Sequence, residues 1–140
     1  MKRQEAFTLL ELMIVVAVIA IVASVAIPGL VNARKAGNEA SAISSMRTLT
    51  TANNQYRTRF QVFASSLTNL GATGYIDSVL GSGFKSGYTF SYAGGSDTWT
   101  TNADPSSPGY SGDRGFFADE SGVIRFVLTG AASATSQPID

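Results

Sequence analysis

The chain has 140 residues, ten basic and ten acidic side chains, and neither cysteine nor histidine. Its length allows one globular domain in addition to a membrane helix, and its zero net charge gives no reason to expect nucleic acid as a partner. Disulfides, thiolate sites, imidazole zinc sites and a Ser-His-Asp triad are all excluded by this composition. Because no phosphate-binding glycine loop or carboxylate pair stands out, we expect no enzyme, no metal site and no cofactor.

The N-terminal third of the sequence contains a long apolar segment. Residues 12–31 carry no ionisable side chain, and roughly 20 apolar residues in helical form cross a bilayer core. We therefore predict a transmembrane helix over 7–33. A secretory signal has a shorter apolar region of about 7–15 residues, whereas an uncleaved signal anchor is an open alternative. Glu11 lies near the start of the segment, where a charge is costly and needs a partner, unless it is solvated at the membrane edge.

A short basic leader, residues 1–5, precedes Ala6-Phe7-Thr8-Leu9-Leu10-Glu11-Leu12. This N-terminus, over about 30 residues, resembles that of type IV prepilins and the related pseudopilins. The resemblance implies that residues 1–6 are a leader peptide, that a prepilin peptidase cuts between Ala6 and Phe7, and that Phe7 is then N-methylated. The family usually has glycine where this chain has Ala6. Both residues are small, so we expect cleavage to occur, although more slowly.

The resemblance also implies how the subunit assembles. The mature chain waits in the inner membrane, its leader end on the cytoplasmic side, and an inner-membrane assembly platform and minor pilins help to extract it into a homopolymeric helical filament. There, Glu11 pairs with the Phe7 amine of a neighbouring subunit and sets the register. Within one chain Phe7 and Glu11 are also one helical turn apart and able to meet.

We predict one long helix from residue 7 to about 60, interrupted at Pro28 and Gly29. Proline removes a helical hydrogen bond and crowds the preceding turn, and glycine further weakens the helix. The plain consequence is a kink. The resemblance implies, in addition, that the segment melts in the filament.

Residues 34–63 form the amphipathic part of this helix and are expected to pack on a globular head. The predicted inward stripe steps by three or four residues and comprises Ala36, Ala40, Ile43, Met46, Leu49 or Thr50, Asn53, Tyr56, Phe60 and Phe63.

The head, residues 64–140, is predicted to be a small antiparallel sheet, so that the fold class is α+β. A helical turn is expected at 66–70, capped by Gly71. Strands are expected at 87–92 and 98–103, followed by a hairpin of 115–119 and 123–127. The tail from 129 to 140 is rich in alanine, serine and threonine, and we expect it to be loose.

Charges are distributed unevenly along the chain. Between residues 34 and 59 the bases Arg34, Lys35, Arg47, Arg57 and Arg59 face only Glu39. In the head, the acids Asp77, Asp97, Asp104, Asp113, Asp119, Glu120 and Asp140 outnumber Lys85, Arg114 and Arg125. A basic stem and an acidic head are able to attract each other between stacked subunits, although chance segregation on a solvated surface is equally compatible. A calcium site at Asp113, Asp119 and Glu120 is a weaker alternative.

The sequence thus favours a structural filament subunit, a type IV pilin, located in the inner membrane before assembly and in an extracellular pilus afterwards. Such a filament serves adhesion, twitching motility or DNA uptake. One alternative is a pseudopilin of type II protein secretion, in a periplasmic pseudopilus. The Asp-Pro-Trp-Gly segment of the common major pseudopilin is absent, since Asp104-Pro105 is followed by Ser-Ser. The other alternative is a membrane-anchored binding domain that does not polymerise.

Overall fold

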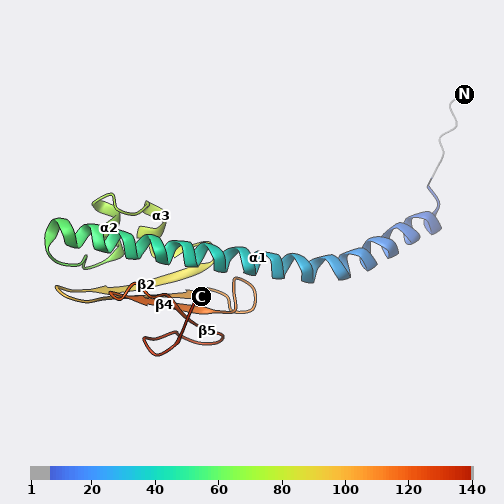
Figure 1. Cartoon of the computed structure of the whole chain (residues 1–140). Helices are drawn as coiled ribbons and strands as arrows, with labels where there is room; N and C mark the ends of the chain where they lie inside the picture. The colour runs from blue at the N-terminus through green and yellow to red at the C-terminus, as the bar shows by residue number, and fades with distance from the viewer. Residues whose placement is uncertain (1–6, 140) are drawn as a thin grey trace, which may run out of the picture. The chain divides into compact units, whose positions relative to one another are not determined.

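A computed structural model describes residues 7–139 of the chain. It shows an α+β architecture in which a long N-terminal helix, α1 (Leu9–Phe60), packs on an antiparallel sheet (Figure 1). The chain divides into two compact units, with a boundary between Ala33 and Arg34. The helix α1 contributes to both units. The predicted leader, residues 1–6, lies outside the described residues, as does Asp140.

The first unit, over its described residues, is the apolar part of α1. The helix begins at Leu9, two residues later than predicted, and it continues through Pro28 and Gly29 without interruption. These two residues therefore do not end the helix, and a kink at them stays a prediction. A proline costs its helix one hydrogen bond, but the surrounding turns retain theirs, and this is sufficient to keep the segment helical. Melting in a filament stays a prediction.

The second unit contains a six-stranded sheet with the strand order β1-β2-β3-β4-β5-β6, in which every neighbouring pair is antiparallel. The strands are β1 (Phe84–Lys85), β2 (Tyr88–Gly94), β3 (Trp99–Pro105), β4 (Gly115–Asp119), β5 (Arg125–Val127) and β6 (Gln137–Pro138). The four longer strands occur close to the predicted positions. Strand β3 alternates between buried and partly buried residues, with Trp99, Thr101 and Ala103 buried. This alternation places one face of the sheet on the core.

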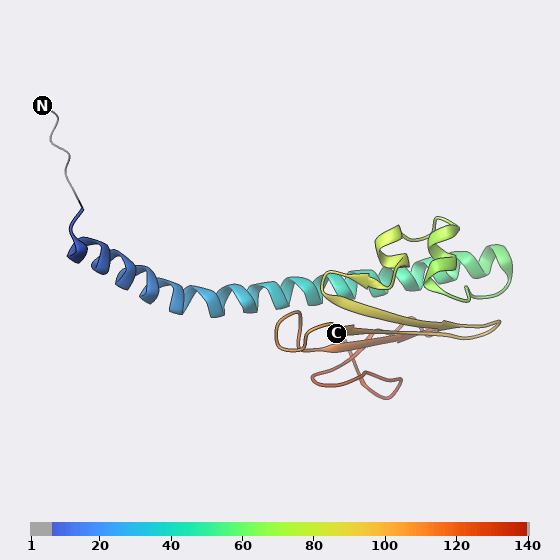
Figure 2. The ribbon, with the colours of Figure 1, turned by 180° about the vertical axis from the view of Figure 1, so that it is seen from behind.

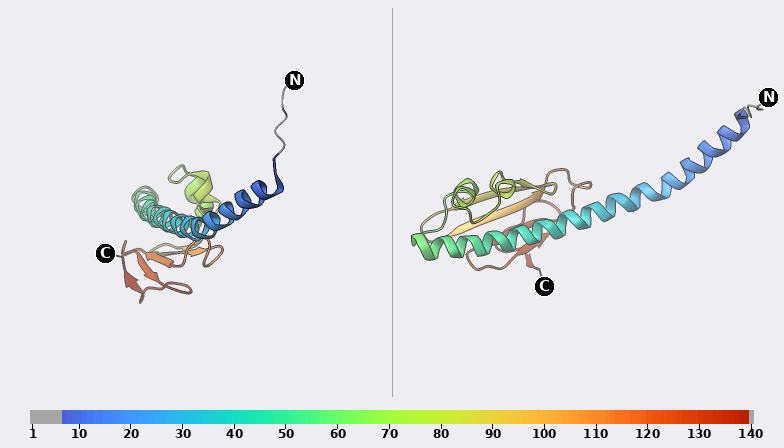
Figure 3. Two further views of the ribbon diagram at one scale, coloured as in Figure 1. Left: turned by 90° about the vertical axis from the view of Figure 1, so that its right-hand side faces the viewer. Right: turned by 90° about the horizontal axis from the view of Figure 1, so that it is seen from above.

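The 34–60 part of α1 and two short helices, α2 (Leu67–Ala72) and α3 (Ser78–Gly81), lie on the same side of the sheet (Figures 1 and 3). The side chain of Ser66 caps α2 by accepting a hydrogen bond from Asn69 N. The end of α2 is formed by Thr73 and not by Gly71. Met46, Leu49, Leu70, Tyr88 and Trp99 join these layers in one core.

The buried stripe of α1 differs from the predicted one at its beginning. Ala36 and Ala40 are exposed, whereas Glu39 and Ala42 are buried. Further along, Met46, Leu49, Asn53 and Tyr56 are buried as expected, but Phe60 is 42% exposed. The prediction followed the small apolar residues and left Glu39 outside the stripe. Its burial is made favourable by partners in the head that are distant in the sequence.

The C-terminal residues are not loose. Strand β6 pairs with β5, and Ile139 N donates a backbone hydrogen bond to Ile124 O. Asn102 on β3 donates to Ala132 O over 2.7 Å, and Ala132 is buried. The segment after β5 therefore covers part of the outer face of the sheet. The composition of residues 129–140 suggested a loose tail because its small residues form no periodic pattern. The pairing of β6, however, depends on the presence of β5 beside it.

Candidate functional site

The first turn of α1 contains Glu11, the acid singled out by the sequence. Thr8 acts as the N-cap, since its Oγ1 accepts a hydrogen bond from Glu11 N at 3.2 Å and its carbonyl accepts from Leu12 N. The spacing Thr-x-x-Glu is that of a capping box, a local signal that the sequence analysis missed. Phe7 precedes the helix and is 82% exposed. Its pairing with Glu11 of a neighbour stays a prediction.

The helix surface between Glu11 and Leu30 is apolar and unburied. Among the described residues, α1 is the one helix long and apolar enough to cross a membrane, and none of its apolar window is buried within the structure. Ile21, Val25 and Leu30, for example, are 68%, 75% and 65% exposed. An apolar surface of this extent requires lipid or a protein partner to cover it.

A cluster of polar contacts joins α1 to the loop between β3 and β4, which runs beside it (Figure 2). The carboxylate of Glu39 accepts hydrogen bonds from Asp113 N (2.9 Å), Arg114 N (3.2 Å) and Arg114 Nε (2.8 Å). Lys35 Nζ pairs with Asp113 Oδ2 at 2.8 Å, and Asn38 Nδ2 donates to Ser111 O. We call this set of contacts, made by Lys35, Asn38 and Glu39, the stem latch.

Electrostatics favour the ionised form of Glu39 in the stem latch. Burial alone would raise the pKa of this carboxyl group, but the Asp113 amide and the guanidinium and amide of Arg114 outweigh that effect and hold its pKa below the ordinary value. The Arg114 side chain is itself held between the rings of Phe116 and Phe126, with its Cζ 5.5 and 5.3 Å from their centroids. Within the stem latch, Glu39 and Arg114 thus form a partly buried ion pair whose carboxylate also accepts hydrogen bonds from two backbone amides.

Two of the three acids considered for calcium make other contacts. Asp113 pairs with Lys35, and Asp119 caps the turn that follows it by accepting hydrogen bonds from Ser121 N and Ser121 Oγ. Within residues 7–139, no group of three or more acids is arranged to hold a metal ion.

Some charged residues of the stem form ion pairs with oppositely charged residues of the head of the same chain. Lys35 of the stem pairs with Asp113 of the head, while Glu39 pairs with Arg114 in the opposite sense. Asp77 pairs with Lys85 within the head. Among the described residues, ten charged side chains take part in no ion pair: Glu11, Arg34, Arg47, Arg57, Arg59, Asp97, Asp104, Asp119, Glu120 and Arg125. One chain therefore leaves charge of both signs available for contacts with other molecules.

The sequence of the N-terminal segment matches the family model of the prokaryotic N-terminal methylation motif over residues 1–27, which is the type IV pilin/prepilin signal. The comparison with curated proteins finds no match for the chain. The motif supports a type IV pilin-like or pseudopilin-type protein, a class whose members are structural and not enzymatic. The motif and the long apolar helix are consistent with membrane anchoring and with a pilus or pseudopilus.

Proposed function

We propose that the chain is the structural subunit of a type IV pilus. This proposal rests on the N-terminal methylation motif and on the apolar helix that follows it, none of whose apolar window is buried within the described part of the chain. Cleavage between Ala6 and Phe7 releases a subunit that stays anchored in the inner membrane. Assembly then exchanges lipid around the helix for the helices of other copies, which keeps the apolar surface away from water.

Glu11 supplies the register in this proposal. Its side chain lies at the start of a helix that is apolar for about 20 further residues, so an unpaired carboxylate there is costly once lipid or protein surrounds it. The methylated amine of Phe7, created by cleavage, is the nearest available cation. The Thr8 cap supports this role because it fixes the first turn of α1, from which the Glu11 side chain extends.

The test replaces Glu11 by glutamine in the full chain and compares it with Glu5→Gln, a matched change in the leader that cleavage removes. Sheared surface material is sedimented, and N-terminal peptides are mapped by mass spectrometry. We expect Glu11→Gln to be cleaved and inserted into the membrane but to yield no filaments, while Glu5→Gln yields filaments that begin at methylated Phe7. Normal filaments from Glu11→Gln would contradict the register role.

The same measurement separates the alternatives. A chain retained in the membrane with Met1 still attached would overturn the filament proposal and favour an anchored binding domain. Methylated Phe7 in short periplasmic filaments, without surface filaments, would identify a pseudopilin of type II secretion.

A further inference from the structure

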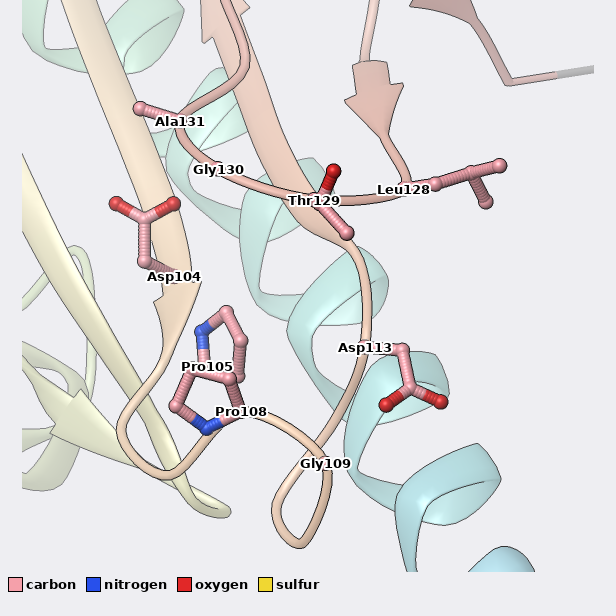
Figure 4. Close-up of a pocket in the computed structure, with 9 residues that line it drawn as sticks. All are labelled: Asp104, Pro105, Pro108, Gly109, Asp113, Leu128, Thr129, Gly130 and Ala131. Atoms are coloured by element: carbon pink, nitrogen blue, oxygen red, sulfur yellow. The ribbon is translucent and has the colours of Figure 1, made fainter.

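The outer face of the sheet contains a pocket at the end of the head where the stem latch lies (Figure 4). Its volume is about 540 Å³. Its apolar wall includes Pro105, Pro108 and Leu128. The two carboxylates of the lining, Asp104 and Asp113, lie on opposite sides of the opening (Figure 4). Asp113 is neutralised by Lys35 of the same chain, which leaves Asp104 as the uncompensated charge of the pocket.

Asp104 is held in a position that costs the isolated chain free energy. Its Oδ1 atom is buried and makes no hydrogen bond among the described residues, and burial raises the pKa of this carboxyl group. Room for the carboxylate depends on Gly115 of the neighbouring strand, because a Cβ there would lie 2.9 Å from Asp104 Oδ1 and 2.5 Å from Gly130 O. The buried Oδ1 atom is not itself accessible to a second copy, so a partner would bind the rest of this half-buried carboxylate and offset the cost of its burial.

The opposite end of the head carries groups that complement this pocket, namely a cation and a partly exposed aromatic ring. At the C-terminus of α1, the Arg59 guanidinium lies 5.3 Å from the ring centroid of Phe60. Phe60 and Val62 are 42% and 39% exposed. A cation on an exposed aromatic ring is suited to a pocket with apolar walls and one carboxylate, because the ring fills the wall while the guanidinium binds the acid.

These two surfaces lie far apart on one head. Asp113, on the rim of the pocket, pairs with Lys35 at the beginning of the head's part of α1, and Arg59 is at the end of that helix (Figures 1 and 2). A helix rises 1.5 Å per residue, so about 36 Å separates Lys35 from Arg59 along the axis. One copy cannot bring them together. Two copies displaced along the helix axis can, and a contact between different surfaces repeats without closing, which produces a filament.

We propose that the Asp104 pocket of one copy receives Arg59 and Phe60 of a second copy, as the head-to-head contact of the assembled protein. This inference rests on the proposed function and names the surfaces that the heads use. Arg57 is not part of the contact, because its guanidinium already lies 4.6 Å from the ring centroid of Phe63, a buried residue of its own head.

Paired cysteines test the contact directly, since the chain has no cysteine of its own. Val62→Cys and Leu128→Cys are combined in one full-length chain, which leaves Arg59 and Phe60 in place; the two side chains are 39% and 68% exposed, so both changes spare the core. Mild oxidation of sheared filaments should then link each copy to the next and give a ladder of covalent multimers on a non-reducing gel. A disulfide requires Cα atoms within about 7 Å, so single-cysteine chains and the pair Val79→Cys with Leu128→Cys should give no ladder.

Charge variants form the second arm of the test. Asp104→Asn should lower the filament yield about tenfold or more, which corresponds to about 1.4 kcal/mol per contact. Asp97→Asn removes the same charge from the turn between β2 and β3 and should not. Arg59→Gln should behave like Asp104→Asn, with Arg57→Gln as its matched control. The melting temperature of the Asp104→Asn monomer should not fall, because the change removes a charge that the isolated head does not compensate.

The outcomes are distinguishable. Filaments that form normally from Asp104→Asn and from the 62/128 cysteine pair, without a ladder, would overturn this contact and leave the proposed function intact. If the cysteine pair itself prevents assembly, the charge variants decide in the same way. Failure of the unaltered chain to form any filament would overturn the proposed function, and this contact with it.

Discussion

Breaking the stem latch at Glu39 should destabilise the head more than any exposed charge change. The residue is 9% exposed and accepts three hydrogen bonds, so Glu39→Ala leaves two backbone amides and a guanidinium without their acceptor. Removing one partner of a fully buried ion pair costs roughly 3–5 kcal/mol. Because the Arg114 side chain is 32% exposed, water compensates part of this loss, and we expect about 2–3 kcal/mol.

The measurement is thermal unfolding of the detergent-solubilised full chain, followed by the fluorescence of Trp99, the single tryptophan, which is 1% exposed. For a domain of about 100 residues, each 1 kcal/mol shifts the melting temperature by roughly 4 °C or more. Glu39→Ala should therefore lower it by about 8–12 °C. Glu39→Gln should cost less, since its amide oxygen is able to accept from the same backbone groups.

Lys35→Gln provides the matched control, because it breaks the neighbouring ion pair, whose Asp113 side chain is 54% exposed. Exposed pairs of this kind contribute at most about 1 kcal/mol. A double-mutant cycle with Arg114→Gln should show coupling of about 1 kcal/mol or more to Glu39. If Glu39→Ala costs no more than Lys35→Gln, or if the cycle shows no coupling, the account of the latch is refuted.

Two further predictions concern pH and close packing. The folded-state pKa of Glu39 is depressed below its ordinary value of 4.5. Its stabilising contribution is therefore present above about pH 4.5 and is lost as pH falls through the lower, folded-state pKa. When the melting temperature is measured at decreasing pH, Glu39→Gln should show a shallower decline than the unaltered chain, and equal slopes would contradict this. Gly112→Ala should lower the free energy of unfolding by about 1–3 kcal/mol, because the added Cβ would collide with the Tyr88 hydroxyl and ring. Gly37→Ala has nothing within 4 Å of the new Cβ and should raise the free energy of unfolding by up to about 1 kcal/mol. Urea unfolding of both variants measures the difference, and two effects of the same sign would disprove the packing argument.

Local sequence was sufficient to predict the N-terminal segment and the main elements of the fold. The motif around Ala6, Phe7 and Glu11 and the apolar run after it are read from contiguous residues, and the family model recognises the same segment. The long helix and the four longer strands also follow from local periodicity. At Pro28 and Gly29 the intrinsic preference of two residues does not end the helix, because their helical neighbours outweigh it.

Tertiary structure decided which side of α1 is buried and where charge is compensated. Glu39 is a surface residue by composition, and only Arg114 and the amides of the β3–β4 loop, about 75 positions later, make its burial favourable. The same holds for β6, whose two residues have no strand pattern until β5 lies beside them, and for Asp104, whose missing partner becomes visible only in the folded head. Spacing along the chain specifies local conformation, whereas the free energy of a buried charge depends on donors that folding brings from distant positions.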